Sequence, residues 1–425
     1  MTDPIILRTR QQIIHELHEA AELEHNLMCT YLYAAFSLKD AADGLNVAET
    51  EAVARWRREI LGIAVGEMSH LVAVWNITAA IGGSPRFGRN NFPIDAGYLP
   101  AGLVVKLAPF SAAVLQHFIY LERPGDSSEP DGTGFETVPF TRGSVLDYPV
   151  TPMSFDYATV GEFYRTLEGA LTGLASQIGE DALFCGDPAL QLSPVEAGLQ
   201  GAHVVRCLKT ALEALAIIVT DGEGAPGSSE NSHFSRFLRI RDEYQVLLAK
   251  NPGFEPAHPA AINPALRRPP GLTGRVWIED PETASIVDLA NAVYQATVRL
   301  LGHSYSLKSP DPEKAFSVRT GVGLMKALTF LAESAARRPA GPANPDCNAG
   351  VSFIALRDAA PLPPEQSTRR LLAESLQELS QKAGELDQVD PRLSHAAGIL
   401  QSMSQRAGEF FVSAPSPATG VLENA

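Results

Sequence analysis

The sequence contains an E-x-x-H step, Glu67-Met68-Ser69-His70, which places a carboxylate and an imidazole on one face of a helix. Glu67 shares that face with an apolar stripe that includes Ile63 and Leu71, so its side chain is predicted to point inward. Glu24 has equally apolar helical neighbours. A carboxylate inside a core is costly unless it is paired or binds a metal. Two inward glutamates on consecutive helices therefore indicate a buried metal centre.

The remaining ligands are predicted from a known pattern, in which two helices each give one glutamate and two others each give an E-x-x-H pair to two irons. Glu162, near the start of the third long helix, is the predicted lone carboxylate, and Glu168 is its competitor. The apolar stripe of the fourth helix leads to Glu223 at its end, and the next histidine is His233. We expect an inserted loop to separate these two in sequence while they stay adjacent in space.

The predicted ligand set combines hard oxygen donors with one imidazole per metal, which suits Fe(II) or Mn(II) and needs no thiolate. A pair of irons is the predicted cofactor, with manganese as the alternative metal. Bridging carboxylates would hold two metals close enough to share O2, and the protein would supply position and a dry pocket. The six predicted ligands are Glu24, Glu67, His70, Glu162, Glu223 and His233.

Each of these residues also has a plain structural interpretation. A lone E-x-x-H occurs by chance on many helices, and an inward Glu24 is compatible with an intrahelical salt bridge. His233 is also placed to cap its helix together with Ser229 and Ser232. Two nearby tyrosines are expected to be core aromatics, and three further histidines are expected in core or surface roles instead of haem ligation: Tyr31, Tyr164, His25, His117 and His203.

Apolar residues recurring every three or four positions predict that the chain is all-α. The second helix ends at Gly82-Gly83-Ser84-Pro85, a strong stop signal. Residues 82–153, rich in Pro, Gly, Asp and Ser, form an irregular insertion long enough to cross a helix bundle. The predicted helices of the first half span residues 9–39, 49–81, 111–121, 159–178, 194–220 and 230–248.

The second half is separated from the first by residues 251–275, whose six prolines predict a semi-rigid linker. We therefore divide the chain into a metal-binding bundle (1–250), this linker, a helical domain (276–413) and a disordered tail (414–425). The second domain shows no residue cluster that suggests chemistry. Its predicted helices span residues 285–304, 312–337, 364–386 and 391–413.

Composition limits the classes of protein to consider. The 425 residues are 45% hydrophobic, so a folded chain is expected, and the net charge of −15 makes nucleic acid and anionic membranes unexpected partners. The four cysteines contain no C-x-x-C pair, which argues against a disulfide framework or thiolate zinc site. Neither a signal segment nor eighteen uninterrupted apolar residues occur. The expected location is the cytoplasm.

Several motifs in order along the chain resemble one family. They are Glu22-Leu23-Glu24-His25-Asn26-Leu27-Met28-Cys29-Thr30-Tyr31, then Glu67-Met68-Ser69-His70-Leu71 with Asn76, then Gly161-Glu162-Phe163-Tyr164, and then Gly222-Glu223-Gly224 before Ser232-His233-Phe234. Over roughly residues 10–250 the chain resembles the ferritin-like domain family of iminophenyl-pyruvate dimer synthase-like proteins. The resemblance implies a ferritin-like four-helix bundle with a long crossover, followed by a second helical domain. Relatives act in violacein-type bisindole biosynthesis.

The chain departs from this family in two respects. Relatives often carry two consecutive glutamates before the methionine, whereas this chain has Gly66-Glu67, which removes one carboxylate and is expected to open the pocket. The chain is also much shorter than the bisindole-forming enzymes, some of which resemble haem proteins in their cofactor use. The resemblance therefore implies a metal bundle and an oxidative role more strongly than it implies imine coupling.

The leading hypothesis is a dinuclear, O2-dependent oxidase or oxygenase of specialised metabolism that acts on a small, amino-acid-derived molecule. A second hypothesis is oxidative dimerisation of an imino acid, at this site or at haem. Iron handling, and a binding protein that has lost its metal, are hypotheses from other classes. The expected partners are the small-molecule substrate and O2, and the sequence leaves a homodimer and an electron-donor protein open.

Overall fold

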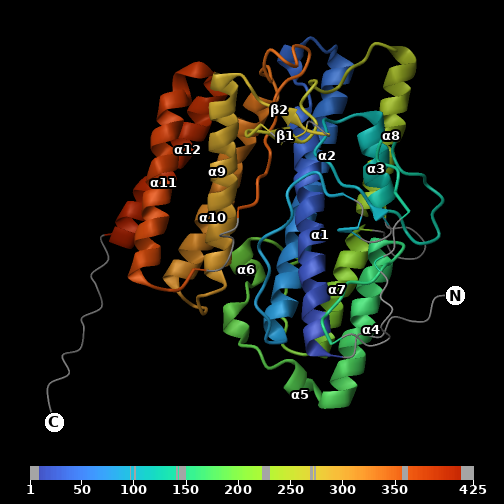
Figure 1. The fold of residues 1–425 in the computed structure, drawn as a ribbon, viewed down its shortest axis with the longest axis vertical. Coiled ribbons are helices and arrows are strands. Elements are labelled where there is room, and N and C mark those ends of the chain that lie inside the picture. Colours follow the sequence, from blue (N-terminus) through green and yellow to red (C-terminus); the bar gives the residue numbers. More distant parts are fainter. Residues whose placement is uncertain are drawn as a thin grey trace.

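The computed structural model of the chain describes residues 9–95, 97–99, 102–139, 142, 150–222, 230–268, 271, 274–356 and 362–412 (Figure 1). It confirms the predicted all-α class. The helices of the first half are α1 (Arg10–Ser37), α2 (Val47–Ala80), α3 (Ala112–Leu121), α4 (Val160–Ile178), α5 (Glu180–Leu183), α6 (Pro194–Ala197), α7 (Leu208–Gly222) and α8 (His233–Lys250). Those of the second half are α9 (Pro281–Ser304), α10 (Pro312–Ala335), α11 (Gln366–Leu386) and α12 (Pro391–Ala407).

The two longest helices, α1 and α2, pack along each other and form the spine of the molecule. Thr9 caps α1 by accepting the Gln12 amide, and α2 begins with a reciprocal capping box between Asn46 and Glu49. Among the described helices, α2 alone is long and apolar enough to span a membrane, yet 67% of its most apolar stretch is buried inside the protein. That burial is expected of a core helix.

The spine is covered on one side by two short helix pairs in place of two long helices. α4 packs on α7 and α3 packs on α8, and α2 contacts both α7 and α8. Figure 1 shows α3 and α8 above α4 and α7. The third and fourth positions of the bundle are therefore each filled by two helices, with a break between them. The bundle with a long connection is the predicted architecture.

The predicted helix over residues 194–220 is wrong in its first half. α6 ends after one turn, because Gly198 adopts a left-handed conformation with φ of 67°. After α6, side chains replace the helical hydrogen bonds of the backbone. The Gln191 side chain makes two hydrogen bonds of 2.7 Å to the backbone of Val205, and the Asn76 amide donates to the His203 carbonyl at 2.8 Å. The helix begins again only at Leu208.

The second half packs against the spine as a second layer. α9 pairs with α10, and α12 contacts both α10 and α11. α10 also contacts α1, and one hydrophobic core runs continuously through both halves. A short parallel pair of strands, β1 (Pro264–Ala265) with β2 (Val276–Trp277), lies between them. α12 ends at Ala407 and continues as one π-helical turn to Val412, and the predicted helix end at 413 lies just outside the described residues.

The proline-rich segment between the halves is fixed to both of them. Its Pro256 carbonyl accepts the Lys39 amide and its His258 amide donates to the Ser37 carbonyl, each at 2.8 Å. Its Pro259 carbonyl accepts the Asn348 amide, also at 2.8 Å. The segment is therefore a packed strap, although the domain boundary at residues 251–275 stays a prediction. The predicted tail, residues 414–425, lies outside the described residues.

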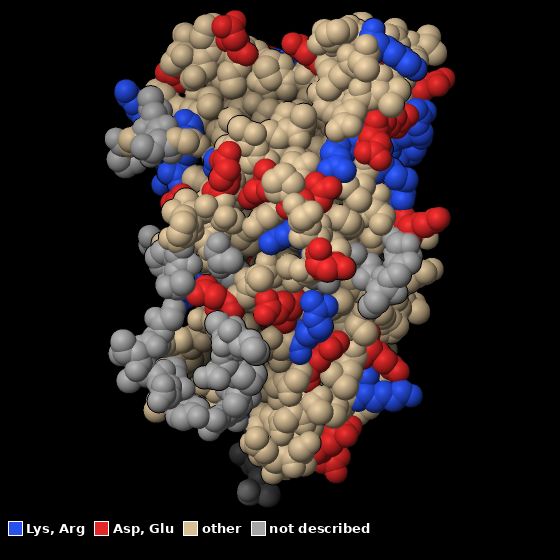
Figure 2. Space-filling model, turned by 90° about the vertical axis from the view of Figure 1, so that its right-hand side faces the viewer, with Lys and Arg blue, Asp and Glu red and all other residues tan. Residues whose placement is uncertain are grey.

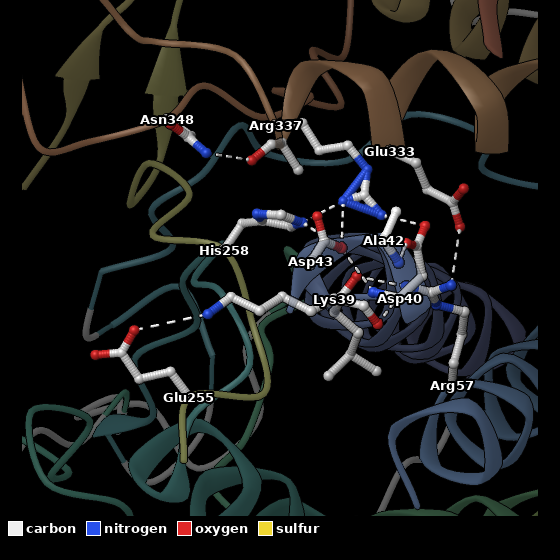
Figure 3. Close-up of polar contacts among 12 residues, drawn as sticks. Lys39, Asp40, Ala42, Asp43, Arg57, Glu255, His258, Glu333, Arg337 and Asn348 are labelled. Atoms are coloured by element: carbon white, nitrogen blue, oxygen red, sulfur yellow. Dashed lines mark hydrogen bonds and ion pairs between the residues drawn. The ribbon is translucent and has the colours of Figure 1, made fainter. Parts of the chain in front are cut away.

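A network of charged side chains joins the end of α1 to the second half (Figure 3). Arg337 donates to Asp40 at 2.6 Å and to Asp43 at 2.9 Å, and it also contacts His258. Partial burial would raise the pKa of Asp40, but the Ala42 amide, Arg337 and Arg392 together hold that pKa below its ordinary value. The network stabilises the contact between the two layers.

We predict that Arg337→Met lowers the free energy of unfolding by about 1–3 kcal/mol, because two half-buried carboxylates lose their shared partner. Since the pKa of Asp40 is depressed in the folded state, this stabilisation is present above its ordinary pKa and is lost in acid. Denaturant unfolding at pH 7 and at about pH 2 measures both effects, since only the lower pH lies below the ordinary pKa of Asp40. Lys382→Met, which breaks an exposed pair with Glu385, is the control and should change the stability by about 0.5 kcal/mol or less. An equal loss in both variants would contradict the prediction.

Glu16 on α1 gives a second prediction, on pH. Its side chain is fully buried, and neither carboxyl oxygen has a hydrogen-bond partner among the described residues. Burial, with the nearby charge of Glu19, raises the pKa of Glu16 to about 9. A raised carboxyl pKa means that stability is complete in acid and falls as the pH rises towards 9. Glu16→Gln should therefore be more stable than the parent by about 1–3 kcal/mol at pH 8 and equal to it near pH 4. A parallel pH dependence of the two proteins would disprove this.

Candidate metal centre

Five ionisable side chains meet inside the bundle. They form two sets of three, each with ligand atoms within 4.8 Å of one another, and Glu67 belongs to both sets. All five are buried, with at most 5% of each residue exposed. The first set is Glu24, Glu67 and His70, and the second is Glu67, Glu122 and His233.

Glu67 uses one oxygen toward each set. His70 Nδ1 lies 3.0 Å from Glu67 Oε2 and 3.4 Å from Glu24 Oε2. His233 Nδ1 lies 2.8 Å from Glu67 Oε1 and 3.8 Å from Glu122 Oε2. A carboxylate with one oxygen in each of two ligand sets has the arrangement of a bridge between two cations.

The broken helices explain how these residues come together. Glu24 and the Glu67–His70 pair are on the spine helices α1 and α2. Glu122 immediately follows the last residue of α3, and His233 is the first residue of α8, where Ser232 is the N-cap. The ends of the short covering helices thus meet at the height of the spine glutamates.

Two buried tyrosines hold the outer carboxylates. The Tyr164 hydroxyl donates to Glu24 Oε1 and the Tyr31 hydroxyl donates to Glu122 Oε1. These hydrogen bonds leave the second oxygen of each glutamate for its histidine. Both tyrosines are fully buried, as predicted for core aromatics, but they also contact the candidate ligands. Burial and the neighbouring carboxylates raise the pKa of both phenols well above the ordinary value.

The electrostatics of the cluster favour bound positive charge. Burial and the charge of Glu67 raise the pKa of Glu24 to about 8. Burial would also raise the pKa of Glu67, but the charges of His233 and His70 outweigh it and hold that pKa well below its ordinary value. Burial by itself would lower the pKa of His233, which Glu67 and Glu122 instead raise to about 9.

The donor atoms fit a pair of metal ions. Three buried atoms that face the two ligand sets form no hydrogen bond with a described residue, although the last two stand 2.8 Å apart: Glu24 Oε2, Glu67 Oε1 and His233 Nδ1. Buried polar atoms normally have partners, and oxygen donors with one imidazole per ion suit Fe(II) or Mn(II). His70 Nε2 faces Asp221 at 3.6 Å, so its Nδ1 remains toward the carboxylates. These residues could hold a metal.

Four of the six predicted ligands are in this cluster, one lies apart from it, and one lies outside the described residues. Glu24, Glu67, His70 and His233 come together. Glu162 is exposed and accepts the Ala158 amide at 2.7 Å, so it serves the start of α4 and lies apart from the cluster. Glu223 lies outside the described residues. The competitor Glu168 is half-buried and is in neither set.

Glu122 and Asp221 are the candidate residues that the sequence interpretation missed. Glu122 ends the apolar helix α3, inside the region judged irregular. A carboxylate is unfavourable at a helix C-terminus, so a glutamate after such an apolar run is itself a signal. His117, weighed earlier for haem, pairs with Asp131 at 2.7 Å and stacks on Phe135.

Gly66 lies directly against the cluster. A Cβ at this position would stand 2.7 Å from His233 Nε2, closer than side chains pack. The imidazole of His233 therefore fills the space that a second glutamate would need, and the expected opening of the pocket is occupied by a candidate ligand.

We predict that Gly66→Ala displaces His233 and weakens Fe(II) or Mn(II) binding by about 10- to 100-fold, measured by anaerobic titration. The control is Gly173→Ala on α4, where a Cβ meets nothing within 4 Å. That variant should keep its metal affinity and gain about 0.5–1 kcal/mol of stability, since alanine favours a helix. Unchanged metal affinity in Gly66→Ala would refute the assignment of His233.

The surface of the molecule on the side of Figure 2 is of mixed charge. On the face shown in Figure 2, Asp and Glu side chains alternate with Lys and Arg side chains. No basic stripe of the kind that tracks a phosphate backbone is visible among the described residues on that face.

Comparison with known proteins agrees with the geometry. The chain is 28% identical over 380 residues to the 2-imino-3-(indol-3-yl)propanoate dimerase of Chromobacterium violaceum, covering 80% of the chain and 34% of the relative. It is 24% identical over 424 residues to the dichlorochromopyrrolate synthase of Lentzea aerocolonigenes, covering 89% and 39%. The chain thus spans little more than a third of the length of these curated relatives.

A crystal structure of a ferritin-like protein from Caulobacter vibrioides is 18% identical, covers 76% of this chain and 96% of its own, and has a TM-score of 0.47, too low to carry an argument. The family assignment rests instead on a family model, described as Ferritin-like, that matches residues 17–242. This match covers more than half of the chain and includes every residue of the cluster. The resemblance found in the sequence is confirmed, and the chain belongs to the Ferritin-like family.

Proposed function

We propose that this protein is an O2-dependent enzyme of specialised metabolism that oxidises a small, amino-acid-derived molecule at a dinuclear metal centre. The observation that carries the proposal is the sharing of Glu67 between two buried ligand sets. Iron is the metal we propose first and manganese is the alternative. Such a pair supplies redox chemistry with O2, and the protein supplies the ligand positions and a dry site.

The residues around the cluster have defined tasks in this proposal. Tyr31 and Tyr164 fix the outer carboxylates, and the rings of Phe118 and Phe237 pack around Tyr31 and exclude water. Asp221, whose side chain is 50% exposed, lies between His70 and the solvent and is placed to orient its imidazole.

Oxidative coupling of two imino acids is the second candidate, and the names of the two relatives favour it. Such a coupling forms one carbon–carbon bond and removes two electrons and two protons, which O2 would accept to give hydrogen peroxide. The test supplies imino acids prepared in situ and looks for a product with the mass of two substrates less two hydrogens. A haem spectrum in the purified protein would move this reaction away from the glutamate cluster.

The metal centre is tested by elemental mass spectrometry of the full chain, purified without chelators and again after anaerobic Fe(II) loading. We expect about two metals per chain and an optical change on admitting O2. Glu67→Gln should lose most of both metals, because it removes the shared ligand. Glu162→Gln, at an exposed glutamate outside the cluster, is the matched control and should retain them. Full metal content in Glu67→Gln, or none in the parent protein, would reject the proposal.

The setting of the enzyme is also proposed. We propose that the enzyme acts in the cytoplasm and that its partners are a small-molecule substrate and O2, with neither nucleic acid nor a membrane. Experiment has to decide whether it forms a homodimer and whether it uses an electron-donor protein. Light scattering separates this proposal from iron storage, which requires a shell of many subunits. A monomer or dimer agrees with the enzyme, and a large cage would favour storage.

A further inference from the structure

A cavity of about 480 Å³ lies between the spine and the second helical layer, apart from the glutamate and histidine cluster. Its walls come from α1, α2, α9 and α10, together with the loop after α6. Three of the six methionines of the chain line it, namely Met28, Met68 and Met325. Flexible thioethers adapt to the shape of an apolar ligand, and the volume is that of a small-molecule site.

The cavity ends at a buried polar group. Tyr294 and His25 line it, and the Tyr294 hydroxyl lies 2.7 Å from His25 Nε2. Arg89 Nε donates to the same hydroxyl at 3.1 Å. The Tyr294 hydroxyl therefore bridges the guanidinium of Arg89 and the imidazole of His25. The aromatic walls at this end include Trp75 and Phe353.

The charge near this end is not balanced. Arg89 is buried, and its guanidinium donates to the Tyr294 hydroxyl and to the carbonyls of Asn90 and Phe353 and also interacts with the Cys29 thiol. It forms no ion pair with any described carboxylate. A buried cation without a carboxylate partner is costly, and Arg89 adds positive potential behind Tyr294, although it does not line the cavity itself.

The mouth of the cavity is apolar and carries a second positive charge. Val65 on α2 and Val322 on α10 line it and are 47% and 39% exposed. Lys326, one turn after Val322, is exposed and forms no ion pair with a described residue. No described lining residue is Asp or Glu, although the whole chain carries a net charge of −15.

The cavity is separate from the metal centre because the spine helices lie between them. Glu24 and Glu67 belong to the metal cluster, whereas the adjacent residues His25 and Met68 line the cavity. Neighbouring positions on a helix point about 100° apart, so each spine helix serves both sites.

We propose that this cavity is a second small-molecule site, which binds an aromatic monoanion with its rings among the methionines and its acidic group near Lys326. The apolar walls favour an aromatic ring system in the ligand. Because no described lining residue is acidic, a negatively charged ligand is favoured over a positively charged one. The site uses no metal ligand, so it stands independently of the proposed function.

The test titrates the full chain with 8-anilinonaphthalene-1-sulfonate, an aromatic monoanion whose fluorescence rises in apolar sites. Calorimetry gives the stoichiometry, for which we expect one site per chain. Val322→Trp, which narrows the mouth, should weaken binding about tenfold or more. Lys326→Glu should weaken it about fivefold or more, while binding of neutral 3-methylindole stays within about twofold, because only the charged ligand meets the reversed charge.

Matched substitutions outside the cavity are the controls. Val195→Trp, at a position 92% exposed, and Lys250→Glu should bind the probe as the parent does. Glu67→Gln should also bind it normally, which separates this site from the metal centre. Thermal unfolding verifies that each variant is folded. The proposal is overturned if the folded parent does not bind the probe, if both mouth variants bind it as the parent does, or if Lys326→Glu weakens 3-methylindole equally.

Discussion

The structure depends on one buried carboxylate. Glu67 lies with one oxygen 3.0 Å from His70 and the other 2.8 Å from His233, and it is almost fully buried. A charge in such a place is tolerated only while its partners stay in position. Those partners come from α2 itself and from the start of α8, so the Glu67 carboxylate ties a covering helix to the spine.

The same constraint explains why the covering helices are short. A continuous helix presents side chains only at its own spacing, whereas a helix end can bring a residue in at another angle. Glu122 and His233 occupy such ends, and the loops that interrupt the bundle lie beside them. The long irregular connection therefore has a structural role, since it delivers Glu122 to the second ligand set. The bundle loses helical backbone hydrogen bonds at these breaks, but the helix ends bring Glu122 and His233 to Glu67 and so form the second candidate ligand set.

The sequence predicts the residues whose positions depend on one helix, and it does not predict those whose positions depend on the path of a long connection. Glu24, Glu67 and His70 were predictable because the apolar spacing on one helix fixes the direction of their side chains. His233 was reached only through an assumed loop. Glu122 was missed because its place depends on the path of residues 82–122, for which local spacing gives no information. Glu162 lies apart from the cluster for a local reason: Thr159 caps α4 by accepting the Glu162 amide, and a glutamate at that position belongs to the helix start.

The spine shows how one helix pair can serve two chemically opposite sites. On α1, Glu24 faces the cluster and His25 faces the apolar cavity, and on α2 the same division holds for Glu67 and Met68. A helix with an apolar stripe on one side needs only one packed layer, but α1 and α2 are buried on both sides and require two. The second helical layer therefore completes the burial of the spine. Because that layer closes the cavity on one face while the short helices close the glutamate and histidine cluster on the other, the bundle and the C-terminal helices share one hydrophobic core.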